Sequence, residues 1–228
     1  MYAPFFFCIF ANDDYHTMPM RRNLRMLCCL TAALFGLWLT GCRGRQEGGS
    51  ILPEGVTLCE GDIVFRRGGG LESHAVMMMD VDGNYSQVGI VVDTLGRLMV
   101  CHAVPGEPDF EGDPDRVKLD DVQTFFSSVY ASCGEVMRLR GDSLSPRQAA
   151  RKALEVYRRG VLFDHAYDSE DTTKMYCTEL VMYAYERNGI QLVQPEVPHE
   201  VEIPLLTASV FYPSDIAKSR LLSSITQF

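Results

Sequence analysis

Two apolar runs rich in β-branched residues, separated by a short polar turn, constrain the fold of this chain most strongly. Residues 88–92 and 98–104 flank the sequence Asp-Thr-Leu-Gly-Arg, in which the glycine can adopt a positive φ. Two apolar, β-branched segments of this length joined by such a turn are typical of an antiparallel hairpin. We therefore predict a β-hairpin here, within a domain that mixes strands and helices.

The hairpin also places two polar side chains near each other. If the turn is centred between Leu95 and Gly96, Gln87 lies opposite Val104 and diagonal to His102. Side chains two positions apart in a strand share a face, so Gln87 and His102 would point the same way. A slip of one residue would separate them.

Other segments predict short alternating elements around this hairpin. Strands are expected at 61–66 and 135–140, and a helix is expected at 71–79. Ser145 and Pro146 suggest the N-cap and first turn of a helix that runs to about Arg159. A last clear helix covers 176–187 and stops at Asn188-Gly189, and the tail beyond it is expected to be irregular.

Cys177 stands at the predicted start of that last helix, behind a polar loop. The unpaired N–H groups and the positive end of the helix dipole favour thiolate over thiol at such a position. A free cysteine can equally be a small buried apolar residue. The sequence thus marks Cys177 as a candidate nucleophile.

The N-terminus has the form of a secretory signal. A basic segment at 20–25 precedes an apolar run at 26–39, which ends in Leu-Thr-Gly-Cys. This run is short for a membrane span, and it fits a signal peptide, 1–41, that is cleaved before a lipid-bearing Cys42. The true start would be Met18 or Met20. A tether, 42–58, would then join the lipid to a domain at 59–228, outside the cytoplasm in a bacterial cell envelope.

Composition limits the ligands that we expect. The chain has 21 basic and 30 acidic residues, a formal charge of −9, which argues against nucleic acid as a partner. The cysteines of the body, Cys59, Cys101, Cys133 and Cys177, form no Cys-x-x-Cys pair, so zinc is not expected. No metal or cofactor is predicted, and a disulfide among the first three remains open.

Four blocks of sequence carry a resemblance to a known family. They are Gly-Asp-Ile-Val-Phe at 61–65, Tyr-Ser-Gln-Val-Gly-Ile-Val at 85–91, Val-Cys-His-Ala-Val at 100–104 and Tyr-Cys-Thr-Glu-Leu-Val at 176–181. Their order and spacing resemble the YiiX-like, circularly permuted papain-like hydrolases of the NlpC superfamily. The resemblance implies an α+β fold in which an antiparallel sheet packs against helices. It also places the family's nucleophile on Cys177 and its third polar position on His102.

Gln87 departs from that family's pattern. The family commonly has histidine at this position as the general base, and a glutamine amide cannot accept a proton at useful pH. Three alternatives follow. In the first, His102 acts as the base while Gln87 orients it or binds an oxyanion. In the second, the domain binds a ligand without turnover. In the third, another histidine, above all His165 in the loop before Cys177, folds back onto the thiol. Tyr176 resembles a family position near the site and either presents its hydroxyl to the substrate or packs.

The resemblance therefore implies a membrane-tethered cysteine hydrolase that cleaves an amide bond, in a cell-wall fragment or a related peptide. In that mechanism the Cys177 thiolate attacks the acyl carbon, and His102 protonates the leaving amine. Backbone N–H groups at the helix start stabilise the oxyanion. The alternatives are a non-catalytic binding module that has lost its base at Gln87, and a lipid acyltransferase.

Overall fold

The predicted hairpin lies at the centre of the sheet. β2 (Gln87–Thr94) and β3 (Arg97–Val104) pair antiparallel with Ile90 facing Cys101, which confirms the predicted register. The turn is tighter than expected, since only Leu95 and Gly96 connect the strands. Both have positive φ, 60° and 83°, as a type I′ turn requires.

The computed structural model describes residues 48–228, except 142, 168–170, 172, 195–196 and 204–205. These residues belong to one compact unit, Gln46–Phe228. The predicted signal peptide 1–41, the predicted lipid site Cys42 and the first part of the tether lie outside the described residues. Within the described part of the chain, no helix has the length and apolar content to cross a bilayer.

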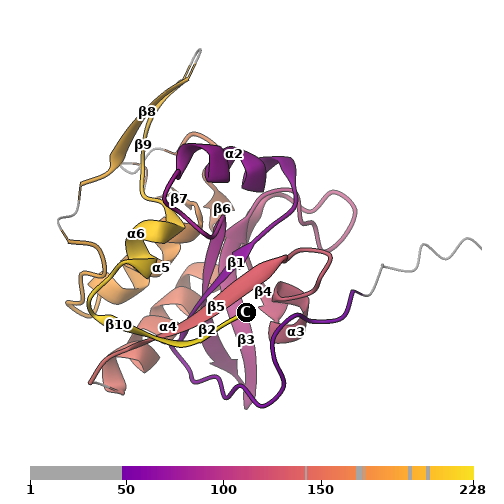
Figure 1. Cartoon of the computed structure of the whole chain (residues 1–228), viewed down its shortest axis with the longest axis vertical. Coiled ribbons are helices and arrows are strands. Elements are labelled where there is room, and N and C mark those ends of the chain that lie inside the picture. Colours follow the sequence, from indigo (N-terminus) through magenta and orange to yellow (C-terminus); the bar gives the residue numbers. More distant parts are fainter. Residues whose placement is uncertain (1–47, 142, 168–170, 172, 195–196, 204–205) are drawn as a thin grey trace, which may run out of the picture. The chain divides into compact units, whose positions relative to one another are not determined.

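Eight strands form one sheet in the order β10-β5-β1-β2-β3-β4-β6-β7 (Figure 1). Every neighbouring pair is antiparallel except β6 and β7, which are parallel. A separate hairpin is made by β8 and β9. The remaining strands are β1 (Ile63–Arg67), β4 (Arg116–Asp121), β5 (Cys133–Leu139), β6 (Leu162–Phe163), β7 (Lys174–Met175), β8 (His199–Ile203), β9 (Leu206–Val210) and β10 (Leu222–Gln227).

The two faces of the sheet have different covers. Alternate residues of the central strands, such as Ile90 and Cys101, pack with two long helices in the main core. The residues between them, such as Val91 and Val100, pack with a short helix in a second, smaller core. The helices of the main core are α4 (Leu144–Arg158) and α5 (Cys177–Glu186), and the short helix is α3 (Val122–Phe125). The mixed α+β class with a mostly antiparallel sheet on helices is therefore as expected.

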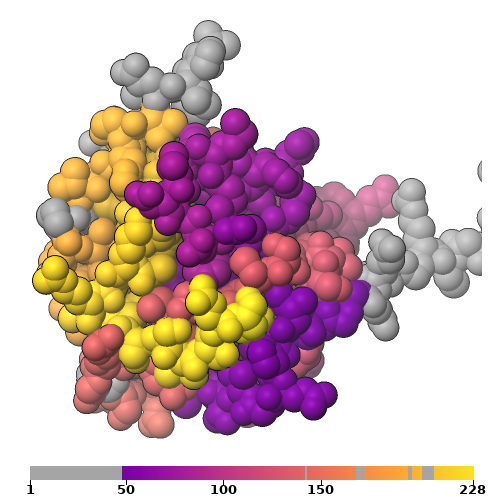
Figure 2. Space-filling model, viewed as in Figure 1, coloured from indigo at the N-terminus to yellow at the C-terminus, as the bar shows by residue number. Residues whose placement is uncertain are grey.

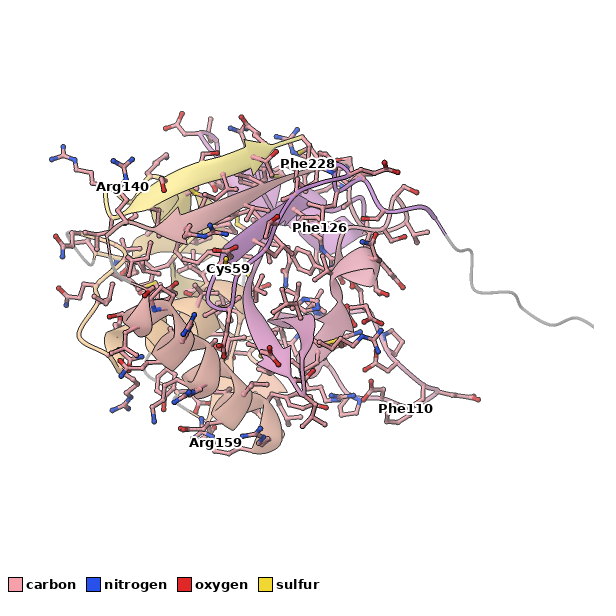
Figure 3. All side chains as sticks on the ribbon, turned by 90° about the horizontal axis from the view of Figure 1, so that it is seen from below. Cys59, Phe110, Phe126, Arg140, Arg159 and Phe228 are labelled. Atoms are coloured by element: carbon pink, nitrogen blue, oxygen red, sulfur yellow. The ribbon has the colours of Figure 1, made fainter. Side chains whose placement is uncertain are left out.

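Two predictions about the chain were wrong. The helix expected from Ser145 begins at Leu144, with Ser143 at the N-cap position. The tail after Gly189 is not irregular, because it forms β8, β9, α6 (Pro213–Ala217) and β10. β10 completes the sheet beside β5, and Phe228 at its end packs against Phe126, with ring centroids 5.2 Å apart (Figure 3). Such pairing depends on contacts distant in sequence, which local patterns do not contain.

The helix expected at 71–79 is present as α2 (Leu71–Met79), but it differs from the core helices. None of its residues is buried, and it lies on the surface (Figures 1 and 2). Three glycines, 68–70, precede it. Val76 on its inner side packs with Ala208 and Val210 of β9, so α2 and the β8–β9 hairpin are joined by a small apolar cluster.

Candidate functional site

A cavity of about 490 Å³ lies where β1 and β3 end and β2 begins. Arg66, Gln87 and Val104 from these strand ends form part of its wall. Cys177 at the start of α5 forms another part. Aliphatic and aromatic side chains from α2, β9 and neighbouring segments supply most of the rest, including Val76, Met79, Tyr167, Val210, Phe211 and Tyr212. The volume and the apolar lining are those of a small-molecule site.

Cys177 is the first residue of α5, so the helix N-terminus lies at the cavity wall. Burial raises the pKa of the Cys177 thiol, because the apolar surroundings disfavour the thiolate. Interactions with the backbone of Val88 and with the hydroxyl and backbone of Thr178 act in the opposite direction and do not overcome burial. The pKa of the thiol is therefore above its ordinary value, although backbone groups at the helix start favour the thiolate.

Tyr176 lines the cavity just before the helix and is 3% exposed. Its backbone N–H donates to Glu179 Oε2 at 3.1 Å, so the Glu179 side chain caps the first turn of α5. The Tyr176 hydroxyl accepts a 2.9 Å hydrogen bond from the N–H of Phe211. Tyr176 thereby joins the start of α5 to the segment that follows β9.

Gln87 and His102 meet, as the hairpin register predicts. Gln87 Nε2 lies 3.3 Å from His102 Nδ1 and donates to the carbonyl oxygen of Ala103 at 2.8 Å. On the other side of the ring, His102 Nε2 is 3.0 Å from Asp120 Oδ2 of β4. Lys118 Nζ, 3.2 Å from Asp120 Oδ1, extends the network.

The charge of Asp120 is stabilised by this network. Burial alone would raise the pKa of its carboxyl group, but the hydrogen bond from His102 and the positive charge of Lys118 outweigh burial. The pKa of Asp120 is therefore below its usual range. With a carboxylate on one ring nitrogen and an amide on the other, His102 has both nitrogens engaged.

His102 and Cys177 belong to opposite faces of the sheet. His102 is fully buried beside Phe125, at a ring-centroid distance of 5.1 Å, in the core that α3 covers. Cys177 belongs to the core that α5 covers. Within the described chain no hydrogen bond joins the two residues, and His102 does not reach the cavity wall. Gln87, at the start of β2, contacts His102 and lines the cavity that Cys177 also lines.

The other described histidines do not approach the thiol. His165 is largely exposed and pairs with Asp115, with His165 Nε2 and Asp115 Oδ2 3.1 Å apart. His74 on α2 contacts the carbonyl of Gly70, and His199 pairs with Asp215. Of these described histidines, none lines the cavity.

Arg66 and Tyr167 line the cavity but were not predicted as site residues. Arg66 is 1% exposed, donates to the carbonyl of Phe125 at 2.9 Å and forms an ion pair with Glu107, which also lines the cavity. An arginine at the end of an otherwise apolar strand was the available signal. Tyr167 has a φ of 53°, a strained conformation for a non-glycine residue. Its sequence context gave no signal.

The cysteines and acidic groups of the described chain show no metal arrangement. Cys59, Cys101, Cys133 and Cys177 are all free thiols. No group of three or more His, Cys, Asp or Glu side chains among the described residues is arranged to hold a metal ion.

The fold is similar to that of a solved bacterial protein. The crystal structure of the metalloprotein yiiX from Escherichia coli O157:H7 matches with a TM-score of 0.58, covering 74% of this chain and 97% of that one at 19% identity. No family model matches the sequence, and a search of curated proteins finds no match. The chain therefore has a YiiX-like fold, and its activity has to be argued from its own residues.

Proposed function

We propose that this chain is a ligand-binding protein on a permuted papain-like hydrolase fold, and that its cavity holds a small amphipathic ligand without turning it over. The observation that carries the proposal is the position of Gln87. It contacts His102 and lines the same cavity as Cys177, so an amide occupies the position at which an acyl-transfer enzyme of this kind would need a base.

The chemistry of the thiol supports binding over catalysis. A cysteine nucleophile needs a lowered pKa or an adjacent base, and burial raises the pKa of Cys177. An amide cannot take the proton at useful pH. Since no described histidine lines the cavity, we infer that the thiol stays protonated and contributes to the wall.

The lining of the cavity indicates the class of ligand. Val76, Met79 and Phe211 offer apolar surface, whereas Arg66 and Gln87 offer polar groups at the strand ends. A molecule with an apolar body and one polar, carbonyl-bearing end matches both parts. Acyl compounds and short apolar peptides, including cell-wall fragments, belong to this class.

A second candidate is a cysteine hydrolase or acyltransferase. It is favoured by the backbone N–H groups of Val88 and Thr178, which point at the thiol and could stabilise an oxyanion. Catalysis would require Gln87 to move so that Nδ1 of His102 could reach the thiol. Nε2 of His102 would keep Asp120 as its partner. Amide-bond cleavage in peptides and transfer of lipid acyl groups would be the two reactions to compare.

The two candidates predict different results in one set of assays. Binding of dodecanamide to the full chain is measured by calorimetry, and hydrolysis of p-nitrophenyl dodecanoate and of a peptide p-nitroanilide is followed by absorbance. We expect wild type and Cys177→Ala to bind dodecanamide equally well and to show no difference in hydrolysis. Gln87→His should add Cys177-dependent hydrolysis, since a placed general base contributes about 10²-fold or more. Wild-type turnover that is lost in both Cys177→Ala and His102→Ala would favour the hydrolase instead.

We further propose that the chain is exported and anchored through a lipid on Cys42, which would hold the cavity at a membrane of the cell envelope. The support is the basic segment, apolar run and Leu-Thr-Gly-Cys sequence at the N-terminus. Mass spectrometry of the protein from membranes tests this. A mature N-terminus at Cys42 carrying acyl groups, absent in Cys42→Ser, is expected; an unprocessed chain in both would contradict the proposal.

A further inference from the structure

The side-chain amide of Gln87 has a single orientation that satisfies its neighbours. The carbonyl oxygen of Ala103 can only accept a hydrogen bond, and the nearest amide atom of Gln87 is 2.8 Å away. That atom must therefore be the Nε2 amide nitrogen. With the nitrogen turned into the sheet, Gln87 cannot offer an N–H to an oxyanion at the thiol.

His102 fixes the same orientation from a second direction. The ring nitrogen near Asp120 Oδ2 donates to that carboxylate, and the other nitrogen, Nδ1, faces an amide nitrogen that can only donate, so Nδ1 is the acceptor. Nδ1 can accept the second hydrogen of Gln87 Nε2 at 3.3 Å. The opposite tautomer would place two donors against each other and would leave the Asp120 carboxylate facing a lone pair.

With Nε2 engaged by Ala103 and His102, the Oε1 atom is the remaining acceptor of the Gln87 amide. Gln87 is 7% exposed and lines the cavity, and its hydrogen bonds within the described residues all involve Nε2. The backbone of the next residue, Val88, is among the groups that act to lower the pKa of the Cys177 thiol. The carbonyl oxygen of this fixed amide is thus the Gln87 group that remains to meet a ligand in the cavity.

We propose that Gln87 is the specificity-determining residue of the cavity, and that its Oε1 accepts a hydrogen bond from an N–H or O–H group of the ligand. The inference rests on the proposed binding function and states which ligands the cavity prefers. A neutral primary amide or alcohol supplies the donor. An ester or an ionised carboxylate of equal chain length has no such donor, and its oxygen atoms would face the Oε1 acceptor of Gln87. Arg66 does not reverse this preference, because Glu107 is already paired with it.

The expected preference follows from the cost of an unpaired acceptor. A site built to hydrogen-bond a donor rejects an analogue that lacks it, because its own polar group loses water without gaining a partner. We expect dodecanamide to bind wild type about tenfold or more tightly than methyl dodecanoate, with dodecanoate ion weaker still.

Calorimetric titration of the full chain with these three compounds tests the proposal. Gln87→Met removes the acceptor at similar volume, so the amide-to-ester preference should fall to about one while the affinity for methyl dodecanoate is kept. Gln87→Asn retains the amide but withdraws it by one methylene, and it should also lose the preference. Gln123→Met, at an exposed position of α3, is the matched control and should bind as wild type does.

The outcomes separate this inference from the proposed function. Binding of amide and ester with equal affinity by wild type would overturn the role of Gln87 and leave a binding protein. A preference that survives in Gln87→Met or Gln87→Asn would do the same. If wild type binds none of the three compounds, the proposed function fails, and the inference fails with it.

Discussion

Gln87 Nε2 lies 3.3 Å from Nδ1 of His102 on the neighbouring strand, and Gln87 lines the same cavity as Cys177. The pair joins the cavity wall to a buried polar network, but it does not join the thiol to an imidazole. This relationship separates the chain from a conventional cysteine–histidine enzyme. It also makes the amide of Gln87, with its second partner Ala103, one of the best-fixed polar groups at the site.

Asp120 is expected to stabilise the fold through this network. Asp120→Ala should lower the free energy of unfolding by about 3 kcal/mol at neutral pH, because Lys118 and His102 lose a buried acceptor. Urea unfolding followed by circular dichroism measures the loss. Asp82→Ala, at an exposed site, is the control and should change stability by less than about 0.5 kcal/mol. Equal stability of the two variants would show that the network contributes little.

Acid should weaken the fold through the same carboxylate. The folded-state pKa of Asp120 is lowered, so its contribution is fully present above the unfolded pKa of about 3.9 and is lost as pH falls through the lower folded value. Wild type should therefore lose stability steeply below about pH 4. Asp120→Asn removes the titration and should give a shallower slope over that range. Parallel curves for wild type and Asp120→Asn would argue against the lowered pKa.

The turn of the central hairpin can be improved. Leu95 has a φ of 60° and is fully exposed, so its side chain adds strain without packing. Asparagine tolerates this conformation and Asn-Gly is the preferred pair in type I′ turns. Leu95→Asn should raise the free energy of unfolding by about 1 kcal/mol, measured by urea unfolding. Leu144→Asn, at another exposed leucine, should give no gain. A destabilised Leu95→Asn would mean that this turn is not type I′.

Tyr176 is expected to hold the cavity wall in place. Tyr176→Phe leaves the buried N–H of Phe211 without its acceptor, which should cost about 1–3 kcal/mol of stability. Protection from hydrogen exchange should fall at residues 208–212, since the tie to α5 is lost. Tyr183→Phe, on the same helix, should leave that protection unchanged. Unaltered exchange at 208–212 in Tyr176→Phe would contradict a positioning role for the hydroxyl.

The register of the hairpin could be predicted from the sequence. The sheet face on which the helix that carries Cys177 packs could not. β-Branched runs and a short glycine turn determine which residues face each other, so the meeting of Gln87 and His102 could be predicted. Which face of the sheet α5 covers depends on its packing against strands distant in sequence, and local periodicity does not contain that information. For the same reason the pairing of β10 with β5 and the approach of α2 to β9 were missed.

The reactivity of the Cys177 thiol against pH is the measurement that tests the central claim most directly. The full chain is treated with iodoacetamide from about pH 5 to pH 10, and alkylation of the peptide that contains Cys177 is followed by mass spectrometry. Our account predicts that wild-type reactivity appears only at or above the ordinary thiol pKa of about 8.5, that His102→Ala leaves the profile unchanged, and that Gln87→His moves it to lower pH. Wild-type reactivity well below that pH, lost in His102→Ala, would mean that an activated cysteine–histidine pair exists and that the chain is an enzyme.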